Sequence, residues 1–185
     1  MRITGGEYGG RLLSVPKSDS IRPTQDRVRE ALFSILQTAI AGADFLDLFA
    51  GSGAVGFEAL SRGARRAVFV ESDREHLATL NANARALRVP PDRFETVCAD
   101  AYRWLKAYSG PGFSVAFADP PYALGRENGY AGVLETLAAG NTVVVGGLFA
   151  AEMTSVQDVA EAAGWELLRD RVYGKTRICI WRRNK

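Results

Sequence analysis

Apolar residues along this chain follow two spacings, and these predict helices and strands in turn. From Thr24, apolar side chains recur every three or four positions through Val28, Leu32 and Leu36, which predicts an amphipathic helix. After Gly42, short apolar runs bounded by glycine or polar residues alternate with further helical patterns. We expect strands at 45–49, 67–70, 94–98, 115–118, 147–152, 167–173 and 177–181, and helices at 53–62, 76–87, 101–108, 130–139 and 156–163.

This alternation predicts an α/β fold in which parallel strands are joined by right-handed helical crossovers. The sheet then has seven strands, is mostly parallel and is covered by helices on both faces. The last two strands are joined by Gly174 and Lys175, so we expect an antiparallel hairpin at the C-terminal end of the sheet. The glycine-rich start of the chain predicts a short N-terminal β-hairpin arm at 1–23, followed by one domain at 24–185.

The composition removes several classes of protein. The chain has 185 residues, of which 47% are hydrophobic and 24% charged, as is typical of one soluble globular domain. No apolar run is long enough for a membrane span, and the first residues lack the apolar core of a signal peptide, so we expect a cytoplasmic protein without a membrane partner. Cys98, Cys179 and His76 are too few and too scattered for a zinc site or a disulfide framework, and we expect no metal.

A glycine loop follows the first predicted strand. In the run from Phe45 to Gly56, Gly51 and Gly53 allow a ligand to approach the backbone, and the next helix offers unpaired amide groups. Such turns bind nucleotide-like ligands in doubly wound sheets. The same spacing also satisfies the dinucleotide fingerprint, so the loop alone does not separate NAD from another adenosyl cofactor.

Three consecutive predicted strands end in a carboxylate: Asp47, Glu71 and Asp100. On parallel strands these ends share one edge of the sheet. Asp47 beside the loop would repel a pyrophosphate but suits the ammonium and sulfonium groups of S-adenosylmethionine. Glu71 would then hold ribose hydroxyls and Asp100 the adenine amino group. The alternative interpretation is that these acids cap the helices that follow them.

The fourth strand runs into Asp119-Pro120-Pro121-Tyr122. Residues before proline favour extended backbone, so this loop is expected to be stiff. The Asp119 carboxylate and the Pro120 carbonyl can accept both hydrogens of one exocyclic amine and favour a pyramidal nitrogen, as N-methylation of a nucleobase requires. Tyr122 can stack on the base. The alternative is a proline-rich turn with an aromatic packing residue.

Together these residues resemble the class I S-adenosylmethionine-dependent methyltransferases of the RsmD type, which methylate the N2 amine of one guanine in 16S ribosomal RNA. The resemblance extends over nearly the whole chain, and its most specific segment runs from Ile21 through Arg22-Pro23-Thr24 to Phe33. It implies a Rossmann-like class I methyltransferase domain at 24–185 and 16S ribosomal RNA as the substrate, which we expect to be presented within an assembling small subunit. We also expect a monomer.

The predicted site follows from this resemblance and from the motifs above. The expected catalytic residues are Asp119, Pro120 and Tyr122. The expected residues that bind S-adenosylmethionine are Asp47, Phe49, Gly51, Ser52, Gly53, Glu71, Ser72, Asp100, Ala101 and Asp119. The expected RNA-binding residues are Arg22, Thr24, Arg27, Arg29, Pro121, Tyr122 and Lys175.

The net charge is only +2, so RNA binding would rely on basic residues gathered near the two ends of the chain. Other functions stay open on these residues alone. An adenine-N6 methyltransferase would grip its amine in the same way, a NAD-dependent oxidoreductase would use the same glycine spacing, and a non-catalytic nucleic-acid-binding module could retain the fold.

Overall fold

The computed structural model describes residues 1–16, 26–120 and 129–184. The helices are α1 (Asp26–Ile40), α2 (Ala54–Ser61), α3 (Arg74–Leu87), α4 (Ala101–Ala107) and α5 (Gly129–Ala139), with a short 3-10 turn η1 (Pro91–Arg93). The strands are β1 (Asp44–Leu48), β2 (Arg66–Glu71), β3 (Phe94–Cys98), β4 (Phe113–Ala118), β5 (Val143–Thr154), β6 (Trp165–Tyr173) and β7 (Thr176–Arg183).

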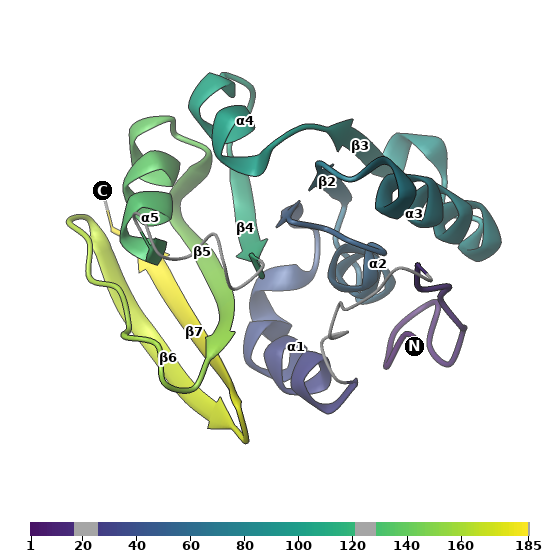
Figure 1. Cartoon of the computed structure of the whole chain (residues 1–185), viewed down its shortest axis with the longest axis horizontal. Coiled ribbons are helices and arrows are strands. Elements are labelled where there is room, and N and C mark those ends of the chain that lie inside the picture. Colours follow the sequence, from purple (N-terminus) through teal and green to yellow (C-terminus); the bar gives the residue numbers. More distant parts are fainter. Residues whose placement is uncertain (17–25, 121–128, 185) are drawn as a thin grey trace.

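The seven strands form one sheet in the order β3-β2-β1-β4-β5-β7-β6 (Figure 1). The first five are parallel to one another, whereas β7 runs antiparallel to both β5 and β6. The expected mostly parallel sheet with an antiparallel C-terminal hairpin is therefore confirmed. Strand order reverses beside β1, between the crossover to β2 and the later crossover to β4, which is where open α/β sheets bind ligands.

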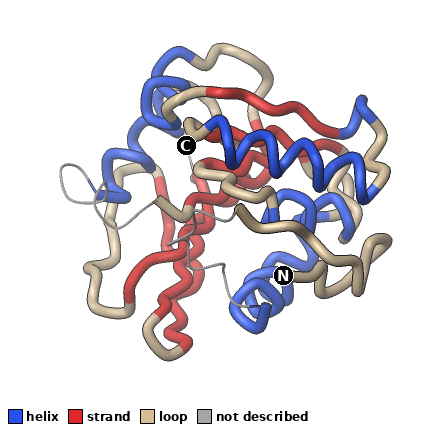
Figure 2. Tube along the Cα trace, turned by 45° about the vertical axis from the view of Figure 1, so that its right-hand side comes forward, coloured by secondary structure: helices blue, strands red, loops and turns tan. Residues whose placement is uncertain are grey.

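The sheet separates two apolar cores, one on each face. Figure 2 shows helices on both sides of the strands. Successive β1 residues alternate between them: Phe45 packs with α1, α2 and α3, and Leu46 packs with α4 and α5. Because both faces are covered, β2 and β4 carry continuous buried apolar runs, at 67–70 and 115–118, rather than an alternating pattern. Helices on both faces are thus confirmed as well.

The described part of the N-terminal arm is a hairpin. Arg2 and Leu12 form an antiparallel bridge, and the Ile3 amide donates to the Arg11 carbonyl at 3.0 Å. Ile3 also lies in the same apolar core as α1 and α2. Gly6 has φ +79°, and a Cβ there would lie 1.9 Å from the carbonyl oxygen of Ser61. Glycine at this position therefore lets the arm lie directly against the end of α2. A domain division at residue 23 falls outside the described residues and stays a prediction.

A buried carboxylate joins the arm to two helices. Glu58 of α2 accepts hydrogen bonds from the Thr4 amide (2.8 Å), the Thr4 hydroxyl (2.7 Å) and the Gly5 amide (3.0 Å). It also pairs with Arg29 of α1 (3.3 Å) and with Arg62 (2.7 Å). Glu58 is fully buried, and these donors satisfy its charge.

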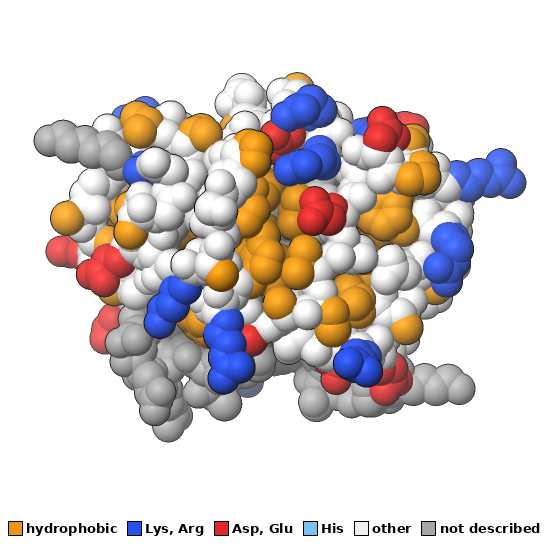
Figure 3. Space-filling model, turned by 90° about the horizontal axis from the view of Figure 1, so that it is seen from above, with side chains coloured by type: hydrophobic (Ala, Val, Ile, Leu, Met, Phe, Trp, Pro, Cys, Tyr) orange, Lys and Arg blue, Asp and Glu red, His pale blue; other side chains and the backbone are white. Residues whose placement is uncertain are grey.

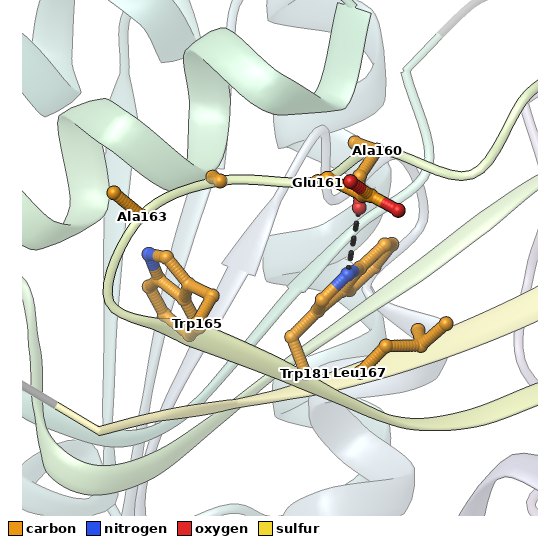
Figure 4. Close-up of a pocket in the computed structure, with 7 residues that line it drawn as sticks. Ala160, Glu161, Ala163, Trp165, Leu167 and Trp181 are labelled. Atoms are coloured by element: carbon orange, nitrogen blue, oxygen red, sulfur yellow. Dashed lines mark hydrogen bonds between the residues drawn. The ribbon is translucent and has the colours of Figure 1, made fainter.

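The predicted helix at 156–163 is wrong, since the structure has turns and irregular backbone there. Side chains of β7 occupy the carbonyls that helical amides would need: the Trp181 indole donates to the Ala160 carbonyl at 3.0 Å (Figure 4), and Arg177 donates to that of Gln157 at 2.5 Å. This extended segment covers β7. A pocket of about 470 Å³ beside it is lined by Ala160, Glu161, Ala162, Ala163, Trp165, Leu167 and Trp181.

Candidate functional site

The predicted cofactor and catalytic residues that the structure describes gather at the carboxyl ends of the central parallel strands. Asp47 lies near the end of β1, Glu71 ends β2, and Asp119 and Pro120 follow β4. The pocket beneath the 156–163 segment includes none of these residues. Its lining residues on β6 and β7, which are Trp165, Leu167 and Trp181, lie at the end of the β6–β7 hairpin away from its turn. We therefore place the candidate site at the carboxyl edge.

The loop from Phe49 to Gly53 has an unusual backbone. Phe49, Gly51 and Gly53 have φ values of 62°, 54° and 82°. A Cβ on Gly53 would lie 2.5 Å from the Phe57 ring, so packing beneath the loop requires glycine at this position. A Cβ on Gly51 would meet nothing within 4 Å, which leaves open space at the loop where a ligand can approach.

Asp47 is buried directly beneath the start of α2. It is 1% exposed, and its Oδ2 accepts a hydrogen bond from the Gly56 amide at 2.8 Å. Burial raises the pKa of Asp47 to about 7, the Gly56 hydrogen bond lowers it in part, and the charge of Glu71 raises it further. The environment of this carboxyl group therefore disfavours its ionised form, and a nearby positive charge would stabilise that form.

Glu71 supports the loop from the neighbouring strand. One carboxylate oxygen accepts from the Gly51 amide at 2.7 Å, and the other accepts from the Asp73 amide at 2.8 Å. Each oxygen has a further lone pair, so a ribose hydroxyl can still donate to it. Ser72, the next residue, is exposed at the same edge.

The third strand-end acid, Asp100, caps a helix. Its exposed carboxylate accepts from the Arg103 amide at 2.9 Å at the start of α4. Ala101 is buried behind it, and the rings of Phe49 and Tyr102 meet edge to face at 5.6 Å. Capping and a ligand contact are compatible here because only one carboxylate oxygen is used by the cap.

Asp119 lies beside an acid that the sequence motifs do not include. Ala118 pairs with Ala151, so Asp119 and Glu152 are neighbours across β4 and β5. Burial raises the pKa of Asp119 well above its usual range, and the charges of Glu152 and Asp47 raise it further. Asp119 and Pro120 remain partly exposed. A single acid at the end of the apolar run 147–151 was the only sequence signal for Glu152.

Tyr130 fixes the backbone beneath this pair. Its hydroxyl donates to the Glu152 carbonyl oxygen at 2.5 Å, and its ring is buried at the start of α5. The described residues on both sides of the 121–128 segment are thus anchored to β4 and β5. Pro121 and Tyr122 lie outside the described residues, so their predicted roles stay predictions.

Among the predicted RNA-binding residues, Arg29 does not fit that role. Its side chain is fully buried, pairs with Glu58 and Asp26, and donates to the Arg2 carbonyl. An RNA phosphate could reach it only if the arm and α1 separated. Arg29 is instead a structural residue, which corrects the prediction.

Two other predicted RNA-binding residues are accessible. Arg27 is exposed on α1, and Lys175 is exposed in the β6–β7 turn. The Lys175 turn lies near the carboxyl end of β5, because Thr154 pairs with Thr176. Arg22 and Thr24 lie outside the described residues. On the face shown in Figure 3, basic and acidic side chains are interspersed around a central apolar area, consistent with the small net charge.

The two cysteines differ in exposure. Cys98 is exposed because it ends β3, the edge strand, whereas Cys179 is buried in β7. Burial raises the pKa of the Cys179 thiol to about 12. Within the described ranges, no three His, Cys, Asp or Glu side chains are grouped to hold a metal ion, and no helix is long and apolar enough to cross a membrane.

Comparison with known proteins connects this geometry to a family. The model of the family described as conserved hypothetical protein 95 matches residues 1–182. The chain belongs to this family. Its similarity to the RsmD type, expected from the motifs, is confirmed by curated relatives. It is 37% identical over 190 residues to ribosomal RNA small subunit methyltransferase D of Escherichia coli, covering 99% of this chain and 90% of that protein. It is 34% identical over 175 residues to the protein of the same name from Haemophilus influenzae, covering 94% of this chain and 89% of that protein.

Solved structures of similar length have the same fold. The Escherichia coli protein yhhF superposes with a TM-score of 0.87 at 33% identity, covering 100% of this chain and 98% of that chain. A Thermus hypothetical protein, TTHA0928, gives a TM-score of 0.80 at 36% identity, covering 97% of this chain and 98% of that one. The Rossmann-like class I methyltransferase fold is therefore confirmed.

Proposed function

We propose that this protein transfers a methyl group from S-adenosylmethionine to the exocyclic N2 amine of a guanine in 16S ribosomal RNA. The observation that carries the proposal is the placement of Asp119 and Pro120 at the end of β4, on the same sheet edge as the glycine loop. The names of the curated relatives supply the RNA class, since they are ribosomal RNA small subunit methyltransferases.

The chain's residues fit this cofactor. S-adenosylmethionine carries a positively charged sulfonium and supplies an electrophilic methyl group. Asp47, Asp119 and Glu152 make the edge acidic, and burial together with the charges of neighbouring acids raises the pKa values of Asp47 and Asp119. A cation held near these acids would stabilise their ionised forms. The open space at Gly51 and the carboxylate of Glu71 suit the nucleoside part.

Asp119 and Pro120 would handle the base amine. In its ionised form the Asp119 carboxylate accepts one N–H, and the Pro120 carbonyl accepts the other. Two acceptors on one amine favour a pyramidal nitrogen and stabilise positive charge that grows on it. The proton that the amine finally loses would leave toward the acidic edge formed by Asp119 and Glu152.

For partner and location, we propose that the substrate RNA is presented within an assembling small ribosomal subunit, that the protein acts as a monomer and that it is cytoplasmic. Exposed basic residues such as Arg27 and Lys175 would contact phosphates. Tyr122 and Pro121 would contact the base, as the sequence motif predicts.

The test combines one variant with mass mapping. Ribosomal RNA and small-subunit particles from a strain that lacks the enzyme are incubated with the protein and S-adenosylmethionine, and the modified nucleotide is identified. Asp119→Ala should lower the rate about 100-fold or more while calorimetry shows cofactor binding retained. Asp92→Asn, on the exposed η1 turn, is the matched control and should behave as wild type. Methylation of adenine, or binding of NAD without binding of S-adenosylmethionine, would refute the proposal.

A further inference from the structure

Asn83 joins two segments that are far apart in the sequence. It lies on α3 and is 2% exposed. Its Oδ1 accepts from the Ser14 amide at 2.8 Å, and its Nδ2 donates to the Ser14 carbonyl at 3.0 Å. The same Nδ2 donates to the Ser52 carbonyl at 2.9 Å. One buried amide group therefore connects the N-terminal arm to the cofactor loop.

The hydrogen bond to Ser52 restrains the loop where it leads into α2. The Ser52 carbonyl belongs to the same planar peptide as the Gly53 amide, which donates to the Ala50 carbonyl at 2.8 Å. Fixing the carbonyl therefore fixes the orientation of that peptide at the start of α2. Gly53, with its φ of 82°, has no side chain of its own to hold the turn in place.

The bonds to Ser14 restrain the arm in the same way. Asn83 both donates to and accepts from the Ser14 backbone, which imitates a pair of β-sheet hydrogen bonds at the end of the hairpin. Arg11 adds a second contact with α3, since it donates to the Leu87 carbonyl at 2.8 Å. The arm also carries Arg2, whose side chain is 66% exposed.

We propose that Asn83 is a positioning residue that couples the cofactor loop to the N-terminal arm, so that filling the cofactor site stiffens residues 1–16. This coupling rests on the proposed function, because it takes S-adenosylmethionine as the ligand of the loop. It follows that the cofactor binds before RNA: the arm, which carries Arg2, is best ordered for RNA binding once the cofactor is bound. A ligand that orders a segment needed by the next ligand gives positive cooperativity.

Hydrogen exchange of the full-length protein, with and without S-adenosylmethionine, tests the coupling. In the wild type, the cofactor should slow exchange of the hydrogen-bonded arm amides of Ile3, Gly10 and Leu13 about fivefold or more. Asn83→Ala should abolish this slowing in the arm while the cofactor still protects α2. Asn81→Ala is the matched control, since Asn81 on the same helix bonds only within it, to the Leu77 carbonyl, among the contacts the structure gives.

A second variant cuts the link from the other end. Ser14→Pro removes the amide that donates to Asn83, whereas Ser14→Ala keeps it and serves as control. The proline variant should also lose the cofactor-dependent protection of the arm. If Asn83→Ala does not fold, this variant tests the coupling in its place. Calorimetry on the same samples separates the two proposals. Cofactor binding that protects the arm equally in wild type and variants overturns the coupling, whereas a wild type that does not bind S-adenosylmethionine overturns the proposed function.

Discussion

Replacing Asp47 with asparagine should stabilise the protein and weaken cofactor binding at the same time. Burial raises the pKa of Asp47 from 3.8 to about 7, a difference of about 3 units. Each unit corresponds to about 1.4 kcal/mol, so above pH 7 the ionised carboxylate destabilises the folded state by about 4 kcal/mol. Asparagine has nearly the same shape, carries no charge and keeps an oxygen for the Gly56 amide.

The sign of the pH dependence follows from the raised pKa. The folded protein binds this proton more tightly than the unfolded chain, so the contribution of Asp47 to stability is greatest at low pH and is lost as pH rises from about 4 to 7. Asp47→Asn should therefore gain about 4 kcal/mol at pH 8 and only about 2 kcal/mol at pH 5.

Urea unfolding of wild type and Asp47→Asn at pH 5 and pH 8 measures these two gains, with Asp92→Asn as the exposed control. Calorimetry at pH 8 should show that Asp47→Asn binds S-adenosylmethionine about tenfold or more weakly, because the variant offers no negative charge to the cation. For the wild type, affinity should fall about tenfold from pH 8 to pH 6 as Asp47 takes up its proton. A variant that is less stable than wild type at pH 8, or a gain equal at both pH values, would refute this reasoning.

Three further experiments test the structure. Gly53→Ala should lower the free energy of unfolding by about 2–3 kcal/mol, because its Cβ would meet an aromatic ring at a positive φ; unchanged thermal unfolding would contradict the loop geometry. Arg29→Ala should lower the free energy of unfolding in denaturant by about 3–5 kcal/mol, because it leaves the buried carboxylate of Glu58 without this partner. Arg27→Ala should change stability by less than about 0.5 kcal/mol and weaken RNA binding. Equal effects of the two variants on stability would argue against the buried pairing. A thiol reagent should modify Cys98 in the native protein and Cys179 only after unfolding, as read by mass spectrometry; rapid native labelling of both would be inconsistent with the burial seen here.

The sheet could be predicted from the sequence because its signals are local and periodic. The central strands lie at or within two residues of their predicted ranges, since the runs 67–70 of β2 and 115–118 of β4 are continuously apolar between clear breaks. β5 begins four residues earlier than expected, at Val143. There Gly146 has φ 81° and the register with β4 shifts, so the strand continues through glycines that usually mark an end.

The failures come from long-range contacts that no local pattern contains. The segment 156–163 has helical spacing, but the indole of Trp181 and the guanidinium of Arg177 take its carbonyls. The sequence predicts that Arg29 binds RNA, and only the fold brings Glu58 to it. Glu152 likewise becomes part of the site only when β5 pairs with β4.

The buried carboxylate of Glu58 has a consequence for how this chain can change over evolution. Its partners come from the arm, from α1 and from the end of α2, so a replacement at Glu58 leaves several donors without an acceptor at once. Compensation would require simultaneous changes at Thr4, Arg29 and Arg62. These positions should therefore covary as one set, and a chimera that takes its first 16 residues from a relative with a different set should fold poorly even when the rest of the chain is unaltered.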